Sequence, residues 1–124
     1  MNKKIKILIA DDERSIARAL NLKLTHMGFD SKIVYNGRDA IDSLQNDNFD
    51  LLILDLIMPK LDGYGVLAEL KEKGIKIPVI VASNLSQPED INKAKEMGAV
   101  DFFIKSDTPV VAVVEKIKKY FKIP

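Results

Sequence analysis

The sequence predicts an α/β fold in which a doubly wound, five-stranded parallel sheet carries five helices on its two faces. Two observations indicate this fold. Short apolar runs alternate along the chain with longer segments whose apolar residues recur every three or four positions. Such runs are typical of parallel strands buried on both faces, and their alternation with helices indicates right-handed crossovers. With 124 residues, of which 47% are hydrophobic and 30% charged, the chain has the size of one domain, residues 1–124.

The first half of the chain contains three of the expected strands. Residues 5–10 (IKILIA) form the first strand, residues 29–35 alternate apolar with polar side chains as an edge strand does, and residues 51–54 (LLIL) form the third. The helix after the first strand ends at Gly28, and a turn at Asn36 begins the next helix. The side chains expected to face the core are Ile16, Leu20, Leu24 and Met27 in the first helix and Ala40, Ile41 and Leu44 in the second.

The third helix follows the third strand after a proline-containing loop. Asp62 is expected to cap this helix, Gly63 to permit a close approach of the backbone, and Gly74 to end the helix. A fourth strand then covers residues 79–82. The side chains of the third helix expected to face the core are Val66, Leu67 and Leu70.

Cap signals also mark the last two helices. Ser86 and Glu89, three residues apart, predict a capping box for the fourth helix, which ends at Gly98. The fifth strand covers residues 101–104, and Thr108 followed by a proline predicts the cap and first turn of the fifth helix. The side chains of this helix expected to face the core are Val110, Val113, Val114, Ile117 and Phe121.

Polar residues follow four of the five strands. Asp11 and Asp12 follow the first strand, Asp55 the third, Ser83 the fourth and Lys105 the fifth. In the flavodoxin-like strand order 2-1-3-4-5, the first, third and fourth strands are neighbours about 4.8 Å apart, so that the three carboxylates converge at one edge. The fifth strand is about 10 Å from Asp55, a distance that a lysine side chain spans.

Three clustered carboxylates repel one another and need a counter-charge. The chain contains no cysteine, and its one histidine, His26, is expected at a helix end in a capping role. Thiolate and multi-histidine zinc sites and Ser–His–Asp catalysis are therefore poor fits. Oxygen ligands favour Mg²⁺. A cation held beside a lysine and a hydroxyl is suited to a phosphoryl group, and the nucleophile is then a carboxylate.

These motifs resemble the receiver domain of two-component response regulators. The similar features are the acidic pair after the first strand, DLIMPKLDG from Asp55, the serine after the fourth strand and FFIK at the fifth. The resemblance covers essentially the whole chain. It implies that Asp55 is the phosphoacceptor, that Asp12, Asp55 and the main-chain carbonyl of Ile57 bind Mg²⁺ directly, and that Asp11 acts mainly through water.

The resemblance also implies the switch and the partners. Lys105 would pair with the phosphoryl group, Ser83 would reorient to contact it, and the rotamer of Phe102 would report the state of Ser83. The phosphodonor would be a histidine kinase or a histidine phosphotransfer protein. The domain would catalyse its own phosphorylation and dephosphorylation but would act mainly as a signalling switch. Its output would pass through the face of the fourth helix, fifth strand and fifth helix to a downstream protein or a second copy.

Three residues depart from the family pattern. Ser106 stands where a proline follows the lysine, Asn84 stands where a small residue follows the serine, and Phe102 lacks the hydroxyl of a tyrosine. Ile57 and Leu85, two residues after Asp55 and Ser83, are apolar and cannot orient a water molecule, so we expect a long-lived acyl phosphate.

Three other functions are alternatives to that of a phosphorylated receiver. A degenerate receiver that binds a partner without phosphorylation remains open. A flavin-binding module of the same fold would need a loop rich in Gly, Ser or Thr after the first strand, where this chain has the acidic ADDERS, residues 10–15. A phosphatase with an aspartate nucleophile would show a second aspartate at residue 57, which is isoleucine here.

The charge and the end of the chain bear on its partners. Nineteen basic and eighteen acidic residues give a net charge of +1, so we expect no direct binding to nucleic acid or to membranes. No stretch approaches about 20 apolar residues, and a cytoplasmic location is the simplest interpretation. Because the sequence ends at Pro124, just after the fifth helix, we expect no effector domain within it, and it is either a stand-alone receiver or a piece of a longer regulator.

The last helix is expected to contribute to the output surface. Val111 and Ala112 extend its apolar surface beyond the buried stripe. Lys116, Lys118 and Lys119 on the same helix are expected to pair with acidic groups of a partner or of a second copy.

Overall fold

The structure, a computed structural model, describes residues 4–124 and contains one five-stranded parallel sheet. Its strand order is β2-β1-β3-β4-β5, as predicted, with β2 at one edge and β5 at the other. The strands are β1 (Lys6–Ala10), β2 (Asp30–Val34), β3 (Leu51–Leu54), β4 (Val79–Ser83) and β5 (Asp101–Ile104). The predicted strands are therefore confirmed to within one residue at each end.

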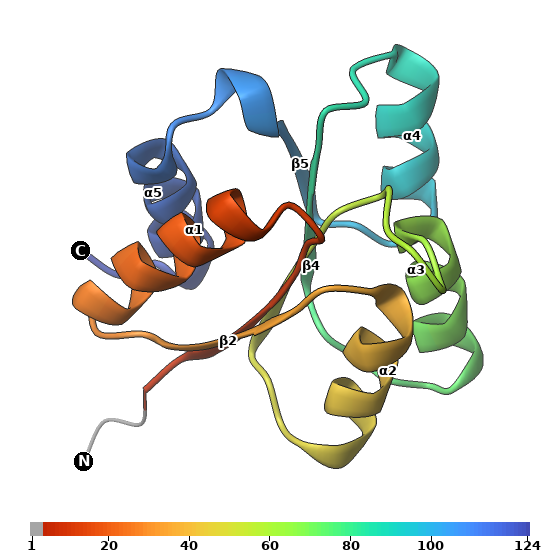
Figure 1. Ribbon diagram of the computed structural model, residues 1–124, viewed down its shortest axis with the longest axis horizontal. Helices are drawn as coiled ribbons and strands as arrows, with labels where there is room; N and C mark the ends of the chain where they lie inside the picture. Colours follow the sequence, from red (N-terminus) through yellow and green to blue (C-terminus); the bar gives the residue numbers. More distant parts are fainter. Residues whose placement is uncertain (1–3) are drawn as a thin grey trace.

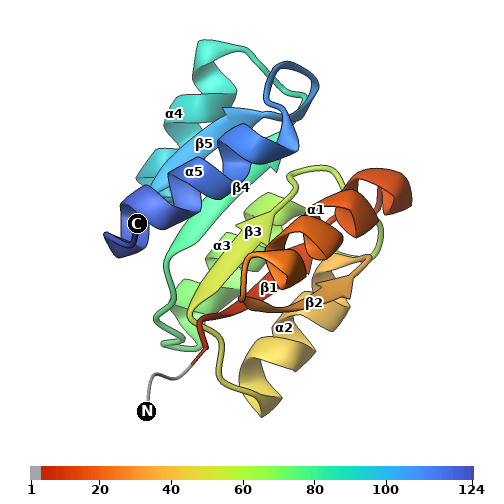
Figure 2. The same ribbon diagram turned by 90° about the vertical axis from the view of Figure 1, so that its left-hand side faces the viewer.

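Helices cover both faces of this sheet (Figures 1 and 2). Helices α1 (Arg14–His26) and α5 (Val110–Phe121) lie on one face, and α2 (Gly37–Asn46), α3 (Gly63–Glu72) and α4 (Pro88–Glu96) lie on the other. Strand side chains alternate between two apolar layers, so that Ile7 and Ile9 pack under α1 and α5 while Leu8 and Ala10 pack under α2 and α3. Among residues 4–124, no helix combines the length and apolar content needed to span a bilayer.

Most of the predicted helix boundaries are confirmed. Asp62 caps α3 by accepting the N–H of Gly65 at 2.8 Å, and Asn36 caps α2 by accepting the N–H of Asp39 at 2.8 Å. Gly28 follows α1 with a φ of +92°, a conformation that a residue without a Cβ adopts readily. The inward faces predicted for α2 and α3 are also buried.

The predicted caps of α4 and α5 are wrong. Pro88 takes the first helical position of α4, so Gln87 is the N-cap and the Ser86–Glu89 pair is out of register for a capping box. Pro109, not Thr108, is the N-cap of α5, because a short 3₁₀ helix, η1 (Lys105–Asp107), uses the residues after β5. Neither helix has a side-chain cap.

Two predicted details of the helix surfaces also differ. In α1 the buried side chains are Ala17, Leu20 and Leu24. Met27, which the sequence predicts to face the core, is the residue after the helix and is 39% exposed. In α5 only the middle of the predicted stripe is fully buried. Lys116 forms an ion pair with Asp101 of the same chain at 3.3 Å, and both side chains are partly exposed to solvent. Val111 is 57% exposed, which agrees with the predicted apolar extension of this helix.

Candidate functional site

The register of the sheet places the polar residues at one edge. Ala10 of β1 is paired with Leu54 of β3, which in turn is paired with Val81 of β4. Asp11 and Asp55 are the next residues, so they leave neighbouring strands at the same level. The N–H of Asp55 donates to the carbonyl of Ala10 at 2.9 Å and holds the two strand ends together. The predicted convergence of these residues is therefore confirmed.

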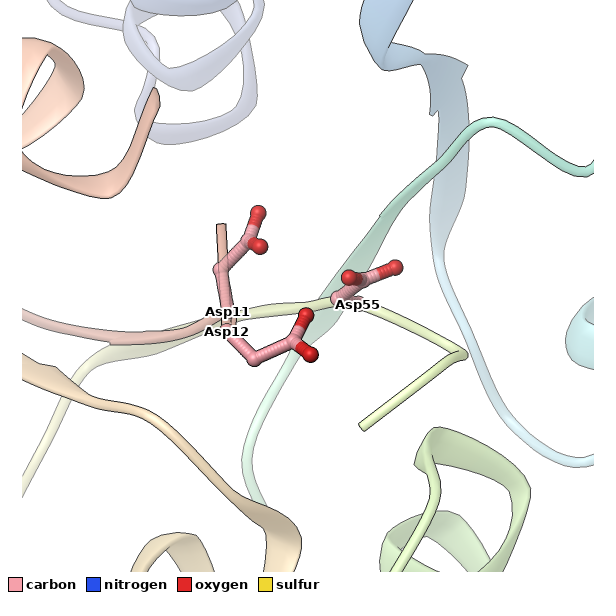
Figure 3. Close-up of side chains that lie close together, drawn as sticks. All are labelled: Asp11, Asp12 and Asp55. Carbon is pink, nitrogen blue, oxygen red and sulfur yellow. The ribbon is translucent and has the colours of Figure 1, made fainter. Parts of the chain in front are cut away.

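Three carboxylates gather at this edge. Asp11, Asp12 and Asp55 each offer an oxygen atom, and these oxygens lie within 4.8 Å of one another. Asp11 and Asp55 are only 5% and 4% exposed, whereas Asp12 is exposed to solvent. Figure 3 shows Asp11 and Asp12 turning in different directions from consecutive backbone positions, beside Asp55 at the end of β3.

A buried lysine reaches this cluster from the end of β5, the edge strand two positions from β3. Lys105, the first residue of η1, is 9% exposed. Its Nζ donates to both carboxylate oxygens of Asp11 at 3.1 Å and to Oδ2 of Asp55 at 3.0 Å. The lysine side chain thus spans β4, as predicted, and bonds directly to the carboxylate at the end of β3.

Glu13 is a third carboxylate partner of Lys105 that sequence reasoning did not identify. Its Oε1 accepts a hydrogen bond from Nζ of Lys105 at 2.5 Å. An acidic residue just before a helix is common because it interacts favourably with the helix dipole, so its residue type and position give no sign of a lysine partner. Only the approach of η1 to the start of α1 reveals the contact.

The site holds more negative than positive charge. Burial raises the pKa of Asp11 to about 6, although the N–H of Glu13 and the charge of Lys105 oppose this shift. Burial likewise raises the pKa of Asp55 against the effect of its Lys105 hydrogen bond. Burial lowers the pKa of Lys105, but the Glu13 hydrogen bond and the charges of Asp11 and Asp55 outweigh it and the net pKa is raised. One ammonium group, which stays charged, therefore compensates these carboxylates incompletely.

The other predicted site residues lie around this cluster without joining its ion pairs. Ser83 is fully buried at the end of β4. Its hydroxyl oxygen accepts a hydrogen bond from the N–H of Leu85 at 3.3 Å, and within residues 4–124 it has no hydrogen bond to another site residue. The N–H of Ile57 donates to Oδ1 of Asp55 at 3.4 Å, while the Ile57 side chain is 60% exposed. Phe102 is half-buried and packs against the apolar layer under α2, α3 and α4.

Gly63 allows the loop after β3 to fold back on the site. Its N–H donates to the carbonyl of Leu56 at 2.9 Å. A Cβ at this position would lie 2.4 Å from the carbonyl oxygen of Asp55 and 2.7 Å from Cα of Leu56, both of which are backbone atoms. The close approach predicted for this glycine is confirmed, because any side chain here would push α3 away from the end of β3.

The donor set of the cluster fits a hard divalent cation. Its ligand atoms are carboxylate oxygens from Asp11, Asp12 and Asp55, and they are close enough together to share one ion. Mg²⁺ prefers oxygen ligands and keeps several water molecules, which the solvent-exposed side of the cluster at Asp12 can supply. A cation here would also offset the excess negative charge.

Comparisons with known proteins agree with this geometry. Residues 7–117 match the family model described as the response regulator receiver domain. The chain is 40% identical over 106 residues to a probable transcriptional regulator, ycf27, of Porphyridium aerugineum, with 86% of this chain and 44% of that protein covered. A second ycf27 relative, from Galdieria sulphuraria, is 34% identical, with 98% of this chain and 49% of that protein covered. The chain thus spans less than half the length of these curated relatives.

Solved structures are similar over nearly the whole chain. The Francisella response regulator 1452 receiver domain has a TM-score of 0.89 and 28% identity, with 96% of this chain and 98% of that chain covered. The signal receiver domain of a signal transduction histidine kinase from Syntrophus aciditrophicus has a TM-score of 0.81 and 35% identity, with 92% and 87% covered.

Proposed function

Because this chain belongs to the response regulator receiver domain family of two-component systems, we propose that it is a phosphoacceptor and that Asp55 takes the phosphoryl group. The observation that carries this proposal is the environment of the Asp55 carboxylate. It is buried at the end of β3, within 4.8 Å of two further carboxylates and 3.0 Å from Nζ of Lys105. A nucleophilic carboxylate with an adjacent cation suits phosphoryl transfer.

The proposed reaction transfers a phosphoryl group from phosphohistidine of a histidine kinase or a histidine phosphotransfer protein. An oxygen of Asp55 attacks phosphorus, the P–O bond forms, and the P–N bond breaks. The bonding pair stays on the imidazole nitrogen, which takes up a proton, and Asp55 becomes an acyl phosphate. Lys105 neutralises charge on the phosphoryl oxygens, since its Nζ already lies beside the attacking carboxylate.

Mg²⁺ is the proposed cofactor of this transfer. Asp12 and Asp55 would hold it directly together with the main-chain carbonyl of Ile57, and Asp11 would hold it mainly through water. When bound, the ion supplies positive charge that offsets the charge of the transferred phosphoryl group. The fit rests on the three converging carboxylates.

The proposed switch begins at Ser83. Its hydroxyl, which accepts a hydrogen bond from the N–H of Leu85, would turn to donate to a phosphoryl oxygen and draw the loop after β4 with it. Phe102, half-buried against the apolar layer that includes Ala94 of α4, would follow. The output would then be a change of the surface formed by α4, β5 and α5, where Val111 is exposed, and would control binding to a downstream protein or a second copy.

The experiment that tests the proposal is phosphorylation with a small phosphodonor in the presence of Mg²⁺. The wild-type chain should form a hydroxylamine-sensitive phosphoprotein, and Asp55→Asn should not. Asp42→Asn, which removes an exposed carboxylate from α2, is the matched control and should be labelled like the wild type. Labelling of Asp55→Asn at the wild-type level would refute the assignment. A wild-type chain that neither is labelled nor binds beryllofluoride with Mg²⁺ would instead be a degenerate receiver.

A further inference from the structure

Glu13 has a chemical environment unlike that of the other carboxylates that contact Lys105. Its side chain is 43% exposed, whereas the side chains of Asp11 and Asp55 are 6% and 5% exposed. It is also outside the group of carboxylates whose oxygens converge. Glu13 can therefore leave Lys105 for water at little cost, which the two buried carboxylates cannot do.

The backbone at the start of α1 directs Glu13 toward the lysine. Glu13 is the N-cap residue of α1, with an extended conformation (φ −80°, ψ 91°), but its side chain caps no helical N–H. Its own N–H donates to Oδ1 of Asp11 at 2.9 Å, which fixes the backbone beside the cluster. The carboxylate is thus free of the helix and bonds Nζ of Lys105 instead.

The hydrogen-bonding capacity of Lys105 is already used in full. An ammonium group has three N–H donors, and here it contacts four carboxylate oxygens from Asp11, Glu13 and Asp55. A phosphoryl group on Asp55 would bring further anionic oxygens to the same Nζ. Asp55 itself is then no longer a carboxylate, and any further hydrogen bond from Nζ to a phosphoryl oxygen has to replace one to Asp11 or Glu13.

We infer that Glu13 is a positioning residue that holds Lys105 in the unphosphorylated state and releases it when a phosphoryl group arrives at Asp55. This inference rests on the proposed function. Its consequence is that the Glu13 carboxylate competes with the phosphoryl group for Lys105 and sets how readily the site accepts one. Removal of the Glu13 charge should make the phosphorylated state easier to reach.

The test compares Glu13→Gln with the wild type by calorimetric titration of beryllofluoride in saturating Mg²⁺. Glu13→Gln should bind beryllofluoride about two- to fivefold more tightly, the range expected for a partly exposed ion pair. Glu72→Gln removes the same charge from an exposed position at the end of α3 and should bind like the wild type. The gain should persist at high salt, because the Lys105 ammonium is buried and poorly screened, whereas a general charge effect would disappear.

Three outcomes separate this inference from the proposed function. Unchanged or weaker beryllofluoride binding by Glu13→Gln, with normal wild-type binding, overturns the role of Glu13 alone. Weaker binding of Mg²⁺ by itself in Glu13→Gln assigns the residue to the metal rather than to Lys105 and also overturns the inference. A wild-type chain that binds no beryllofluoride overturns both the proposed function and the role of Glu13.

Discussion

The side-chain oxygen of Asn84 accepts a hydrogen bond from the backbone N–H of Ser106 at 2.9 Å. These residues directly follow Ser83 and Lys105, so the bond joins the loop after β4 to the loop after β5. A proline at position 106, which the family pattern has, carries no N–H and cannot donate this bond. Two of the departures from the family pattern therefore form one contact, next to two residues of the candidate site.

The Asn84–Ser106 hydrogen bond should contribute measurably to stability. We expect Asn84→Ala to lower the free energy of unfolding by about 1 kcal/mol, measured by urea denaturation. Asn84→Asp keeps the acceptor and should lose much less. In a Ser106→Pro background, Asn84→Ala should have no further effect, since the donor is already gone. Equal losses in both backgrounds would show that the effect of Asn84 does not pass through Ser106.

Asp11→Asn should stabilise the metal-free domain at neutral pH. Burial raises the pKa of Asp11 from 3.8 to about 6, so the folded state binds more protons than the unfolded state between these values. The unfavourable contribution of Asp11 is absent below about pH 4 and grows to about 1–3 kcal/mol above pH 6, and the variant removes it together with the Lys105 ion pair. Urea unfolding in EDTA at pH 4 and pH 7.5 measures the difference. Asp42→Asn should change little, and a gain for Asp11→Asn that is the same at both pH values would contradict this account.

Gly63→Ala should destabilise the fold and impair the site. The added Cβ would meet the backbone of Asp55 and Leu56, which cannot move without shifting the end of β3, so we expect a loss of about 1–3 kcal/mol. Gly65→Ala is the matched control, because its Cβ meets mainly the flexible side chain of Leu61 and an alanine favours the helix. Thermal unfolding and labelling with a phosphodonor measure the two effects. A Gly63→Ala variant as stable as Gly65→Ala would show that α3 has room to move.

The acyl phosphate should decay faster when polar groups replace Ile57 and Leu85. Ile57 is 60% exposed beside Asp55 and Leu85 is half-buried beside Ser83, and neither can orient an attacking water molecule. We expect Ile57→Asn combined with Leu85→Gln to accelerate dephosphorylation by up to about 100-fold. Decay of the labelled protein after removal of the donor measures the rate. Leu22→Gln, at an exposed position on α1, is the control, and unchanged decay in the double variant would reject the idea.

Val111→Glu should separate phosphorylation from output. Val111 is 57% exposed on α5, and we expect beryllofluoride with Mg²⁺ to strengthen self-association or partner binding through the α4, β5 and α5 surface by about 1–3 kcal/mol. Val111→Glu should lose this gain in sedimentation experiments while Asp55 is still labelled. Leu22→Glu alters a similarly exposed position on α1 and should keep the gain. Chemical-shift changes on activation that stay near Asp55 and leave α4 and α5 unaffected would reject this surface.

The sequence by itself determined the fold and the edge at which the polar residues meet. Four of the five strands are short apolar runs that end at a carboxylate, a hydroxyl or an amine, so the strand order alone brings Asp11, Asp55 and Lys105 together. Parallel strands end at one edge whatever their detailed packing, and a lysine side chain tolerates the uncertainty of a few ångströms that remains.

Only the tertiary structure decided which residues cap the last two helices and which partners Glu13 and Asn84 contact. The Ser86–Glu89 pair and Thr108 are good caps in isolation, but Pro88 and the 3₁₀ turn at Lys105 shift both helix starts away from them. Glu13 and Asn84 have the residue types of an ordinary helix start and an ordinary loop. Their partners, Lys105 and Ser106, are 92 and 22 residues away along the chain, and such contacts depend on how the loops pack across the sheet edge. Periodicity and spacing describe neighbours along the chain, whereas these hydrogen bonds exist because the fold brings distant loops together.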